Sequence, residues 1–299
     1  MMKQAQLTPP IAGDLAGMFS QFPEVAGLSV TLLGSGTDHH AFDVGGRFVF
    51  RVPRSEEAAS GAERERRLTS MLAARLPLPI PLHRFVVEPS ERLPFGASGY
   101  ARLSGEPGIQ LGAEPPQRRA VARVLGAFLR ALHDVDVHIA AEAGAPPDDD
   151  PTLEEWSAQA VEDVARARGE GLIDAETSAS LQRYLGAAPV GPYRPTLVHG
   201  DLAAEHVLLD ADGSVSGVID WSDAMIADPA LDLAGFFHWG GAEMLAEALE
   251  TYGASDAETI TRARWFAACR AVADIVFGVD EGKPEYVAAG QRALVHVGS

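Results

Sequence analysis

The sequence predicts an α+β fold, with a β-rich first part followed by a larger, mainly helical second part. Short apolar runs and turn signals fill the first hundred residues, whereas long segments of helical periodicity dominate after Pro115. Between them, residues 104–108 form a connector that contains glycine and proline. This order of elements is typical of α+β segregation. We therefore place an N-terminal domain over residues 1–103 and a C-terminal domain over residues 104–299.

The N-terminal part carries strand signals on both sides of one helix. The glycine pair Gly45-Gly46 lies between two short apolar runs and predicts a β-hairpin. Residues 56–76 place alanine, leucine and arginine at helical spacing, which predicts a helix in spite of Gly61. The predicted strands cover residues 28–33, 40–44, 47–52, 82–87 and 98–103.

The C-terminal part is predicted to be mainly helical. Glu155 follows Thr152 by three residues and Glu258 follows Ser255 by three, so each pair fits a capping box at a helix start. The predicted helices cover residues 117–135, a segment that begins at Thr152, residues 174–186, and most of the chain after residue 230, including a helix that ends near Phe277.

The composition limits the partners and the compartment. Hydrophobic residues make up 46% of the chain, which predicts a folded globular protein. The 24 basic and 42 acidic residues give a net charge of −18. This balance disfavours nucleic acid and favours cationic small molecules. The single cysteine, Cys269, excludes an intrachain disulfide, and no apolar run approaches the length of a membrane span. We expect a cytoplasmic monomer without nucleic-acid or membrane partners.

A motif for phosphoryl transfer lies between His199 and Trp221. Such a reaction needs a carboxylate that orients the attacking hydroxyl, ligands for a cation on the phosphates, and a fixed positive group. Asp201 suits the first role, while His206, five residues later, and Asp220, at the end of an apolar run, suit the second. Alone, His199-Gly200-Asp201 is most often a connecting turn. The offsets of His206 and Asp220 favour the catalytic interpretation.

The segment 197–234 resembles the aminoglycoside phosphotransferase superfamily, which is protein-kinase-like. The resemblance rests on His-Gly-Asp, the residue five positions after the aspartate, Ile-Asp-Trp, and Asp228-Pro-x-x-Asp232. Most members carry asparagine where this chain has His206, a feature similar to the macrolide 2'-phosphotransferases, which residues 37–54 also resemble. The resemblance implies a bilobal protein-kinase-like fold, with a small β-rich N-terminal lobe and a larger helical C-terminal lobe.

The same resemblance implies an activity and its cofactors. GTP, or alternatively ATP, would donate its γ-phosphate with Mg²⁺ to the desosamine 2'-hydroxyl of a macrolide antibiotic and inactivate the drug. Asp201 would be the base, and His206 and Asp220 the metal ligands. Magnesium prefers oxygen ligands, and this leaves three alternatives for His206. It binds the metal directly, it acts through a water, or it only fixes the loop by a hydrogen bond.

The nucleotide end is expected in the N-terminal part. Ser35, between Gly34 and Gly36, is in the place of a phosphate-covering loop, although short glycine loops are mostly ordinary turns. Only two lysines occur, both near the ends of the chain, so Arg51 on the third predicted strand is the candidate phosphate anchor. Its expected partner is Glu65, with Glu63 as a weaker choice. The alternative for Arg51 is a solvent-facing strand residue.

The purine is expected between the two parts of the chain. Backbone groups of Tyr100, Ala101 and Arg102 would bond its edge, and Leu208 and Ile219 would form the floor of the pocket. Simple core packing is the alternative for both apolar residues, and the two can hold together. The other two aspartates of the motif, Asp228 and Asp232, are expected to hold the loop backbone.

The acceptor is left open by the sequence. A macrolide needs a broad apolar cleft with a few carboxylates. The aromatic candidates, which helical spacing also places in a core, are Phe236, Phe237, Trp239, Trp265, Phe266 and Tyr286; the acidic candidates are residues 148–150 and 280–281. The alternatives are an aminoglycoside, homoserine or choline-like acceptor, or a silent binding module, against which the presence of Asp201 and Asp220 argues.

Overall fold

The structure, a computed structural model, describes residues 12–36, 38–111 and 115–298. Thr37, the first residue of the segment 37–54, lies outside them. The chain divides into two compact units, of which the first ends at Ala74 and resumes over Ile80–Leu103. The second unit takes Arg75–Pro79 and the chain from Ser104 onward. The backbone N–H of Val218 donates to the carbonyl of Pro79 (3.0 Å), which ties that short segment to the second unit.

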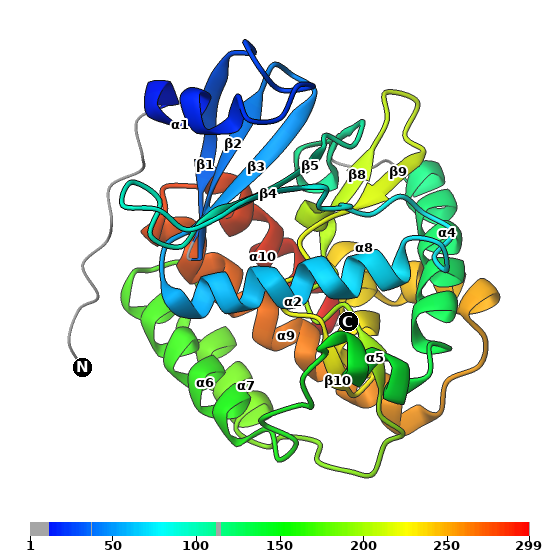
Figure 1. The fold of residues 1–299 in the computed structure, drawn as a ribbon. Helices are drawn as coiled ribbons and strands as arrows, with labels where there is room; N and C mark the ends of the chain where they lie inside the picture. Colours follow the sequence, from blue (N-terminus) through cyan, green and yellow to red (C-terminus); the bar gives the residue numbers. More distant parts are fainter. Residues whose placement is uncertain (1–11, 37, 112–114, 299) are drawn as a thin grey trace. The chain divides into compact units, whose positions relative to one another are not determined.

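The first unit is built on an antiparallel sheet (Figure 1). Its strand order, among the described residues, is β1-β2-β3-β5-β4. The predicted hairpin between the second and third strands is confirmed, with Gly45 and Gly46 at φ of 63° and 68°, angles that favour glycine. The bounds are β1 (Val30–Ser35), β2 (His39–Val44), β3 (Phe48–Pro53), β4 (Phe85–Val87) and β5 (Ala97–Ala101).

One face of this sheet carries an aromatic core. The rings of Phe19 and Phe50 stack with centroids 4.0 Å apart, and Phe85 stacks on Phe50 at 5.6 Å. Phe19 ends the helix α1 (Ala12–Phe19). The predicted helix after β3 is α2 (Glu56–Leu72), where Ser55 accepts the N–H of Ala58 as N-cap. It ends four residues before the predicted position.

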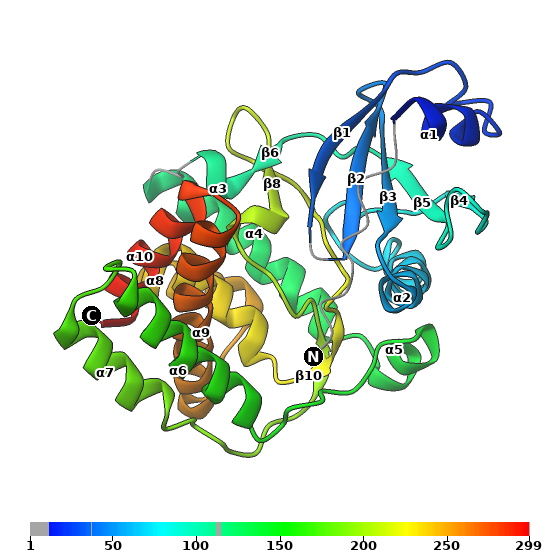
Figure 2. The same cartoon turned by 90° about the vertical axis from the view of Figure 1, so that its left-hand side faces the viewer.

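The second unit is mainly helical, as predicted. In Figure 2, α6 and α7 run beside α9, and α10 lies against the same helix. The predicted helix over 117–135 corresponds to α4, and the one over 174–186 to α7. The bounds are α3 (Gly108–Leu111), α4 (Pro115–His133), α5 (Val137–Ala143), α6 (Glu154–Gly169), α7 (Ala175–Leu185), α8 (Ala230–Tyr252), α9 (Ala257–Asp280) and α10 (Pro284–Gly298).

Both predicted capping boxes are wrong in their residues. The helix expected from Thr152 begins at Glu154, and its first N–H groups, those of Glu154, Glu155 and Trp156, are accepted by the carboxylate of Asp150 (2.9–3.0 Å). The helix expected from Ser255 is capped by the next residue, Asp256, which accepts the N–H of Thr259 (2.7 Å). In both cases a carboxylate lies nearby and is the stronger acceptor beside the positive end of a helix.

Short strands frame the predicted motif. β7 (Thr196–Val198) pairs with β10 (Met225–Ala227), and β8 (Val207–Leu209) pairs with β6 (Glu106–Pro107) and with β9 (Val215–Val218). The chain therefore enters the motif from β7, leaves it through β8, and returns to it after β9. Of the helices, α8 supports this region, and it bends at Gly240-Gly241, where the backbone is not helical.

Among the described residues, no helix is both long enough and apolar enough to cross a membrane.

Candidate active site

The loop over residues 199–206, which we call the catalytic loop, is held by one buried aspartate of α8. Asp232 accepts hydrogen bonds from the backbone N–H of His199 (2.8 Å) and of Gly200 (3.0 Å). The ring of His133, from α4, donates to the same carboxylate at 3.0 Å. The sequence-based expectation that Asp232 holds the loop backbone is confirmed. Asp228 holds the start of α8, because it accepts the N–H of Ala230 and pairs with Arg262.

His199 is fully buried and joins the two halves of the motif. Its Nε2 lies 3.1 Å from the carbonyl oxygen of Ile219, and its Nδ1 accepts the N–H of Asp201 at 3.3 Å. These two bonds require the neutral ring with its proton on Nε2. Burial lowers the pKa of His199, which favours the same form. The loop is thus fixed to the strand end that carries Asp220.

Gly200 adopts a backbone conformation that another residue would strain. Its φ is 83°, and a Cβ at this position would lie 2.2 Å from the carbonyl oxygen of Asp223. The close approach lets the loop pass directly beside the segment after Asp220. A glycine is therefore required here for two independent reasons, its φ and the lack of space.

Asp201 lies between two cationic groups. One carboxylate oxygen is 3.4 Å from Nδ1 of His206, and the other is 3.4 Å from Nη1 of Arg270 on α9. Burial alone would raise the pKa of Asp201, but His206 and Arg270 outweigh it and the pKa lies below its ordinary value. The carboxylate is ionised at neutral pH and is free to accept a proton from a hydroxyl.

His206 ends the 3₁₀ helix η1 (Ala204–His206), and its two ring nitrogens have different surroundings. Nδ1–H donates to the carbonyl oxygen of Asp201 at 2.8 Å, while Nε2 faces Asp220, 3.8 Å from its Oδ2. The hydrogen bond by which His206 was expected to fix the loop is therefore present. It leaves Nε2 directed at Asp220, the second predicted metal ligand. Burial opposes a charge on this ring, but Asp201, Asp220 and Glu205 raise its pKa to about 9.

Asp220 itself has a left-handed backbone with φ of 63°, rare for a residue with a side chain. The hydroxyl of Ser222 donates to its Oδ1 at 2.8 Å. Asp223, three residues later, has its pKa raised to about 6 by burial and by the charges of Asp201 and Asp220. Negative charge is thus concentrated at the catalytic loop, as a cation site requires.

Asp220 and the neutral form of His206 would hold a cation that is shared with phosphate oxygens. Within the described part of the chain, no group of three or more histidine, cysteine, aspartate or glutamate residues is arranged to hold a metal ion. Magnesium in phosphotransferases commonly takes one or two protein ligands and completes its shell with phosphate and water. A histidine ligand usually donates its other N–H to a backbone carbonyl, as His206 does. The role of both residues as metal ligands stays a prediction.

In the first unit, Arg51 and Glu65 form a buried ion pair. Nη1 of Arg51 lies 2.8 Å from both carboxylate oxygens of Glu65, and the side chains are 12% and 1% exposed. The alternative of a solvent-facing Arg51 is therefore wrong. Two histidines complete the cluster: Nη2 of Arg51 donates to His39 (3.2 Å), and Nε2 of His83 lies 3.6 Å from Glu65. Glu63, the weaker candidate, is exposed and pairs with Arg66.

The other residues predicted to contact the nucleotide lie on or beside strands of the same sheet. Ser35, at the end of β1, shares a hydrogen bond with Nδ1 of His40 (2.8 Å). Tyr100 is buried against His83, with ring centroids 4.9 Å apart, and Ala101 is an exposed residue of β5. Arg102 pairs with Asp43 at 2.8 Å, and its N–H donates to the carbonyl of Arg47. Contact of these residues with a nucleotide stays a prediction.

In the second unit, the two apolar candidates flank the loop. Leu208 is buried in β8, as the core-packing alternative expected. The N–H of Ile219 donates to the carbonyl oxygen of His206 at 2.9 Å, which joins the strand end before Asp220 to the catalytic loop. Their predicted place on the floor of a purine pocket is compatible with this packing and stays untested.

Most of the acceptor candidates serve the fold instead. Phe236, Phe237, Trp265 and Phe266 are buried in the core of the second unit. Of the acidic candidates, Asp150 caps α6, Asp148 accepts the hydroxyl of Tyr193, and Asp280 pairs with Arg166. Trp239 differs, since it lines a cavity of about 310 Å³ together with Glu205 and His238. Burial, reinforced by Asp274, raises the pKa of Glu205.

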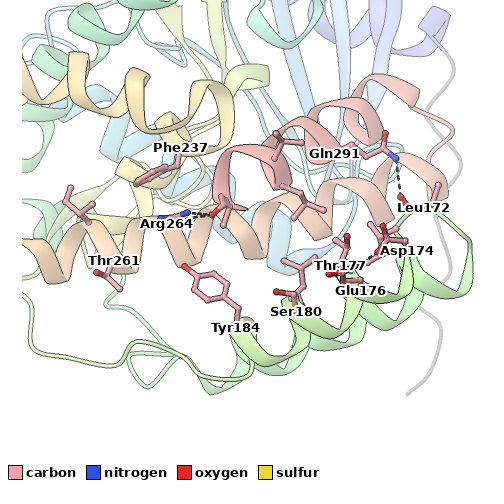
Figure 3. Close-up of a pocket in the computed structure, with 16 residues that line it drawn as sticks. Leu172, Asp174, Glu176, Thr177, Ser180, Tyr184, Phe237, Thr261, Arg264 and Gln291 are labelled. Carbon is pink, nitrogen blue, oxygen red and sulfur yellow. Dashed lines mark hydrogen bonds between the residues drawn. The ribbon is translucent and has the colours of Figure 1, made fainter. Parts of the chain in front are cut away.

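A larger cavity of about 1020 Å³ lies elsewhere in the second unit. Figure 3 shows side chains of α7, such as Tyr184, facing those of α9 and α10, such as Arg264 and Gln291. Its lining residues include Phe237, one of the aromatic candidates for the acceptor, but none of them belongs to the catalytic loop. Two of its polar side chains bond within the protein: Arg264 donates to the carbonyl of Val297, and Gln291 donates to that of Leu172.

Three residues of the site were missed by the sequence analysis: Arg270, Glu205 and His133. Arg270 follows Gly200 by 70 residues and belongs to no local motif, so no signal in one sequence points to it. Glu205 could have been found, because it directly precedes His206. His133 lies in the last turn of a regular amphipathic helix, where a basic residue is common because it interacts favourably with the helix dipole. Nothing in the sequence therefore distinguishes it.

The fold and the site together define a protein-kinase-like phosphotransferase. Solved structures share the fold: the GDP complex of aminoglycoside 2'-phosphotransferase-IIIa superposes with a TM-score of 0.74, at 24% identity, over 96% of this chain and 98% of that one. The fold class predicted from the sequence is thereby confirmed. The chain belongs to the APH family, the phosphotransferase enzyme family, whose model matches residues 29–266.

Two further relatives agree with this assignment. Macrolide 2'-phosphotransferase type I is 30% identical, with a TM-score of 0.65, over 96% of this chain and 99% of that one. Hygromycin-B 4-O-kinase of Escherichia coli is 28% identical over 251 residues, which make up 80% of this chain and 69% of the relative. The family is thus settled as a phosphotransferase, and its relatives act on more than one class of compound.

Proposed function

We propose that this enzyme transfers the γ-phosphate of GTP, or alternatively of ATP, to the desosamine 2'-hydroxyl of a macrolide antibiotic. The observation that carries the proposal is the geometry of His206, which holds Asp201 through Nδ1 and faces Asp220 through Nε2. Histidine at this position is the feature that resembles macrolide 2'-phosphotransferases. The 30% identity to macrolide 2'-phosphotransferase type I, over nearly the whole of both chains, supports the same acceptor.

Asp201 performs the central step. Its ionised carboxylate orients the acceptor hydroxyl and accepts the proton as the hydroxyl oxygen attacks the γ-phosphorus. The bond from the γ-phosphorus to the bridging oxygen breaks, and the nucleoside diphosphate leaves. When bound by His206 and Asp220, a divalent cation supplies positive charge against the phosphate oxygens. His199 and Asp232 keep the loop fixed through buried hydrogen bonds.

At the nucleotide end, Arg51 supplies the fixed positive charge. Its bond to the buried Glu65 uses Nη1 and holds the guanidinium in one orientation. Related solved structures include complexes with GDP and one with ATP, which supports a purine nucleotide as donor. Preference for GTP rests on the resemblance to the macrolide enzymes.

A second acceptor class, the aminoglycosides, has its own support. Hygromycin-B 4-O-kinase is 28% identical to this chain. The carboxylates around the catalytic loop, with a net charge of −18 for the chain, suit a polycationic acceptor as well as the single ammonium of desosamine. A catalytically silent module is the least supported alternative, because Asp201, His206 and Asp220 are present and close together.

The deciding experiment offers the purified enzyme labelled GTP and ATP with Mg²⁺ and a panel of macrolides, aminoglycosides, homoserine and choline. The expected product is a macrolide phosphorylated on the desosamine, identified by mass spectrometry. Phosphorylation of aminoglycosides but of no macrolide would show that the acceptor is wrong.

The assignment of the base is tested in the same assay. Asp201→Ala is expected to abolish transfer while nucleotide binding survives. Asp201→Asn is the better matched variant, because it keeps the shape of the side chain beside Arg270. Undiminished turnover in either variant would contradict the role of Asp201 as base.

A further inference from the structure

We propose that Arg270 is a positioning residue that fixes the carboxylate and the backbone of the catalytic base; its kinetic effect rests on the proposed function. The guanidinium reaches the loop from the middle of α9. Nη2 donates to the carbonyl oxygen of Gly200, and Nη1 donates to that of Leu202 at 3.3 Å. Nη1 also lies 3.4 Å from Oδ1 of Asp201. One side chain thus holds the residues on either side of the base and the base itself.

The surroundings of Arg270 leave the guanidinium little freedom. The residue is 8% exposed, and its neighbours Cys269 and Ala271 are buried in the same helix. Among the described residues, its hydrogen bonds and its ion pair all go to residues 200–202. A buried cation is stable only when its charge is compensated, and here Asp201 supplies the compensating charge. The charge of Arg270 is therefore placed directly against the carboxylate that it positions.

The contacts require an arginine and not merely a positive charge. A guanidinium presents five N–H donors in one plane, so two nitrogens can serve three acceptors at fixed angles. A lysine presents one nitrogen on a flexible chain and keeps the charge without this geometry. Arg270→Lys therefore separates positioning from charge compensation.

Arg270 acts on Asp201 from the side opposite to His206. The two side chains contact different oxygens of the carboxylate, Arg270 at Oδ1 and His206 at Oδ2. Without Arg270, two loop carbonyls lose their donor, and the carboxylate is fixed at one oxygen only. A displacement of about 1 Å at a reacting group lowers a rate about 10²-fold. The chemical step is thus expected to suffer more than the binding of nucleotide or acceptor.

The kinetic test compares Arg270→Lys with the wild-type enzyme. We expect kcat to fall by about 10- to 100-fold, while KM for nucleotide and for acceptor each change by less than about twofold. Arg270→Ala is expected to have a still lower kcat. Added guanidinium ion should restore part of that kcat, whereas methylammonium should not. Arg264→Lys is the matched control, since Arg264 lies on the same helix and donates to Val297. Its kcat should be that of the wild type.

A second readout does not depend on turnover. Amide hydrogen exchange over residues 199–203 of the full chain should be faster in Arg270→Lys than in Arg264→Lys. If the wild type phosphorylates no acceptor, the proposed function fails, and the exchange experiment alone decides the role of Arg270. A kcat within about twofold of the wild type, a change confined to KM, or unchanged exchange would overturn the inference. Failure of both Arg270 variants to fold would also overturn it, in favour of a general structural role.

Discussion

Asp232 and His133 lie 3.0 Å apart, and both side chains are buried. The contact joins α4 to the start of α8. The same carboxylate accepts the N–H groups of His199 and Gly200, so a single side chain connects two helices to the catalytic loop. The hydroxyl of Tyr252 shares a hydrogen bond with the other nitrogen of the His133 ring (2.9 Å), which fixes the ring in turn. The geometry of Asp201, the proposed base, therefore depends on a buried carboxylate of another element.

Asp232→Asn is expected to destabilise the protein by about 3 kcal/mol. The amide that replaces the carboxylate offers one acceptor oxygen in place of two, and its NH₂ group would meet a buried N–H donor. Urea unfolding at neutral pH measures the change. Asp212→Asn is the control, because Asp212 accepts only local bonds in an exposed turn, and we expect less than about 0.5 kcal/mol there. Equal stability of the two variants would show that Asp232 is not the main support of the loop.

The contribution of Asp232 should depend on pH in one direction. Burial raises the pKa of this carboxyl, but the hydrogen bonds from the His133 ring and from the backbone N–H of His199 help to outweigh it, and the pKa is lowered. A lowered folded-state pKa means that the stabilisation is complete above an unfolded value of about 4 and is lost as the pH falls through the folded value. The stability gap between wild type and Asp232→Asn should therefore be constant from pH 7 to pH 5 and shrink below about pH 4. A gap that widens on acidification would contradict this.

Gly200→Ala should be far more harmful than alanine at another glycine of positive φ. A methyl group at 200 meets the carbonyl oxygen of Asp223, whereas Gly282 has φ of 64° with open space around it. We expect Gly282→Ala to lower stability by about 1 kcal/mol and to leave kcat unchanged. Gly200→Ala should lower stability by more than about 2 kcal/mol and reduce kcat by at least about tenfold. Thermal unfolding and initial rates, measured on both variants, check the comparison.

Arg51→Met should weaken nucleotide binding by about tenfold or more. The change removes the proposed phosphate contact and leaves the buried Glu65 without its bidentate partner. The control is Arg66→Met, because Arg66 lies on α2 and pairs with the exposed Glu63. Isothermal titration with a non-hydrolysable GTP analogue measures both. Unchanged affinity in Arg51→Met would remove Arg51 from the nucleotide site.

His206→Asn should retain turnover within about tenfold of the wild type, because asparagine stands at this position in most of the superfamily that the motif resembles. His206→Ala should require about 10- to 100-fold more Mg²⁺ for half-maximal rate, since it loses both the proposed ligand and the bond to Asp201. Magnesium titrations of the initial rate distinguish the variants. If His206→Ala responds to Mg²⁺ as the wild type does, the histidine only supports the loop.

The sequence predicted contacts between elements that follow one another in the chain and contacts within a motif of fixed spacing. Arg51 and Glu65 lie on consecutive elements, so the strand and the next helix bring them together, and Asp232 belongs to a motif with fixed spacing. Arg270 could not be predicted, because its approach to Asp201 depends on how α9 packs. The caps that Asp150 and Asp256 supply were assigned to Thr152 and Ser255, since several polar side chains compete for the same N–H groups. Core and pocket aromatics share one periodicity, so the sequence could not separate Phe236 from Trp239.

The left-handed backbone of Asp220 has a consequence for how the enzyme could be engineered. Glycine is the residue that this conformation suits best, and an aspartate there holds about 1 kcal/mol or more of conformational energy in the folded chain. Asp220→Gly is therefore a candidate thermostabilising change that would at the same time remove the proposed cation ligand. Selection of this enzyme for heat resistance alone would favour this substitution and so yield stable but inactive proteins. Position 220 is where the conflict between stability and activity should be visible.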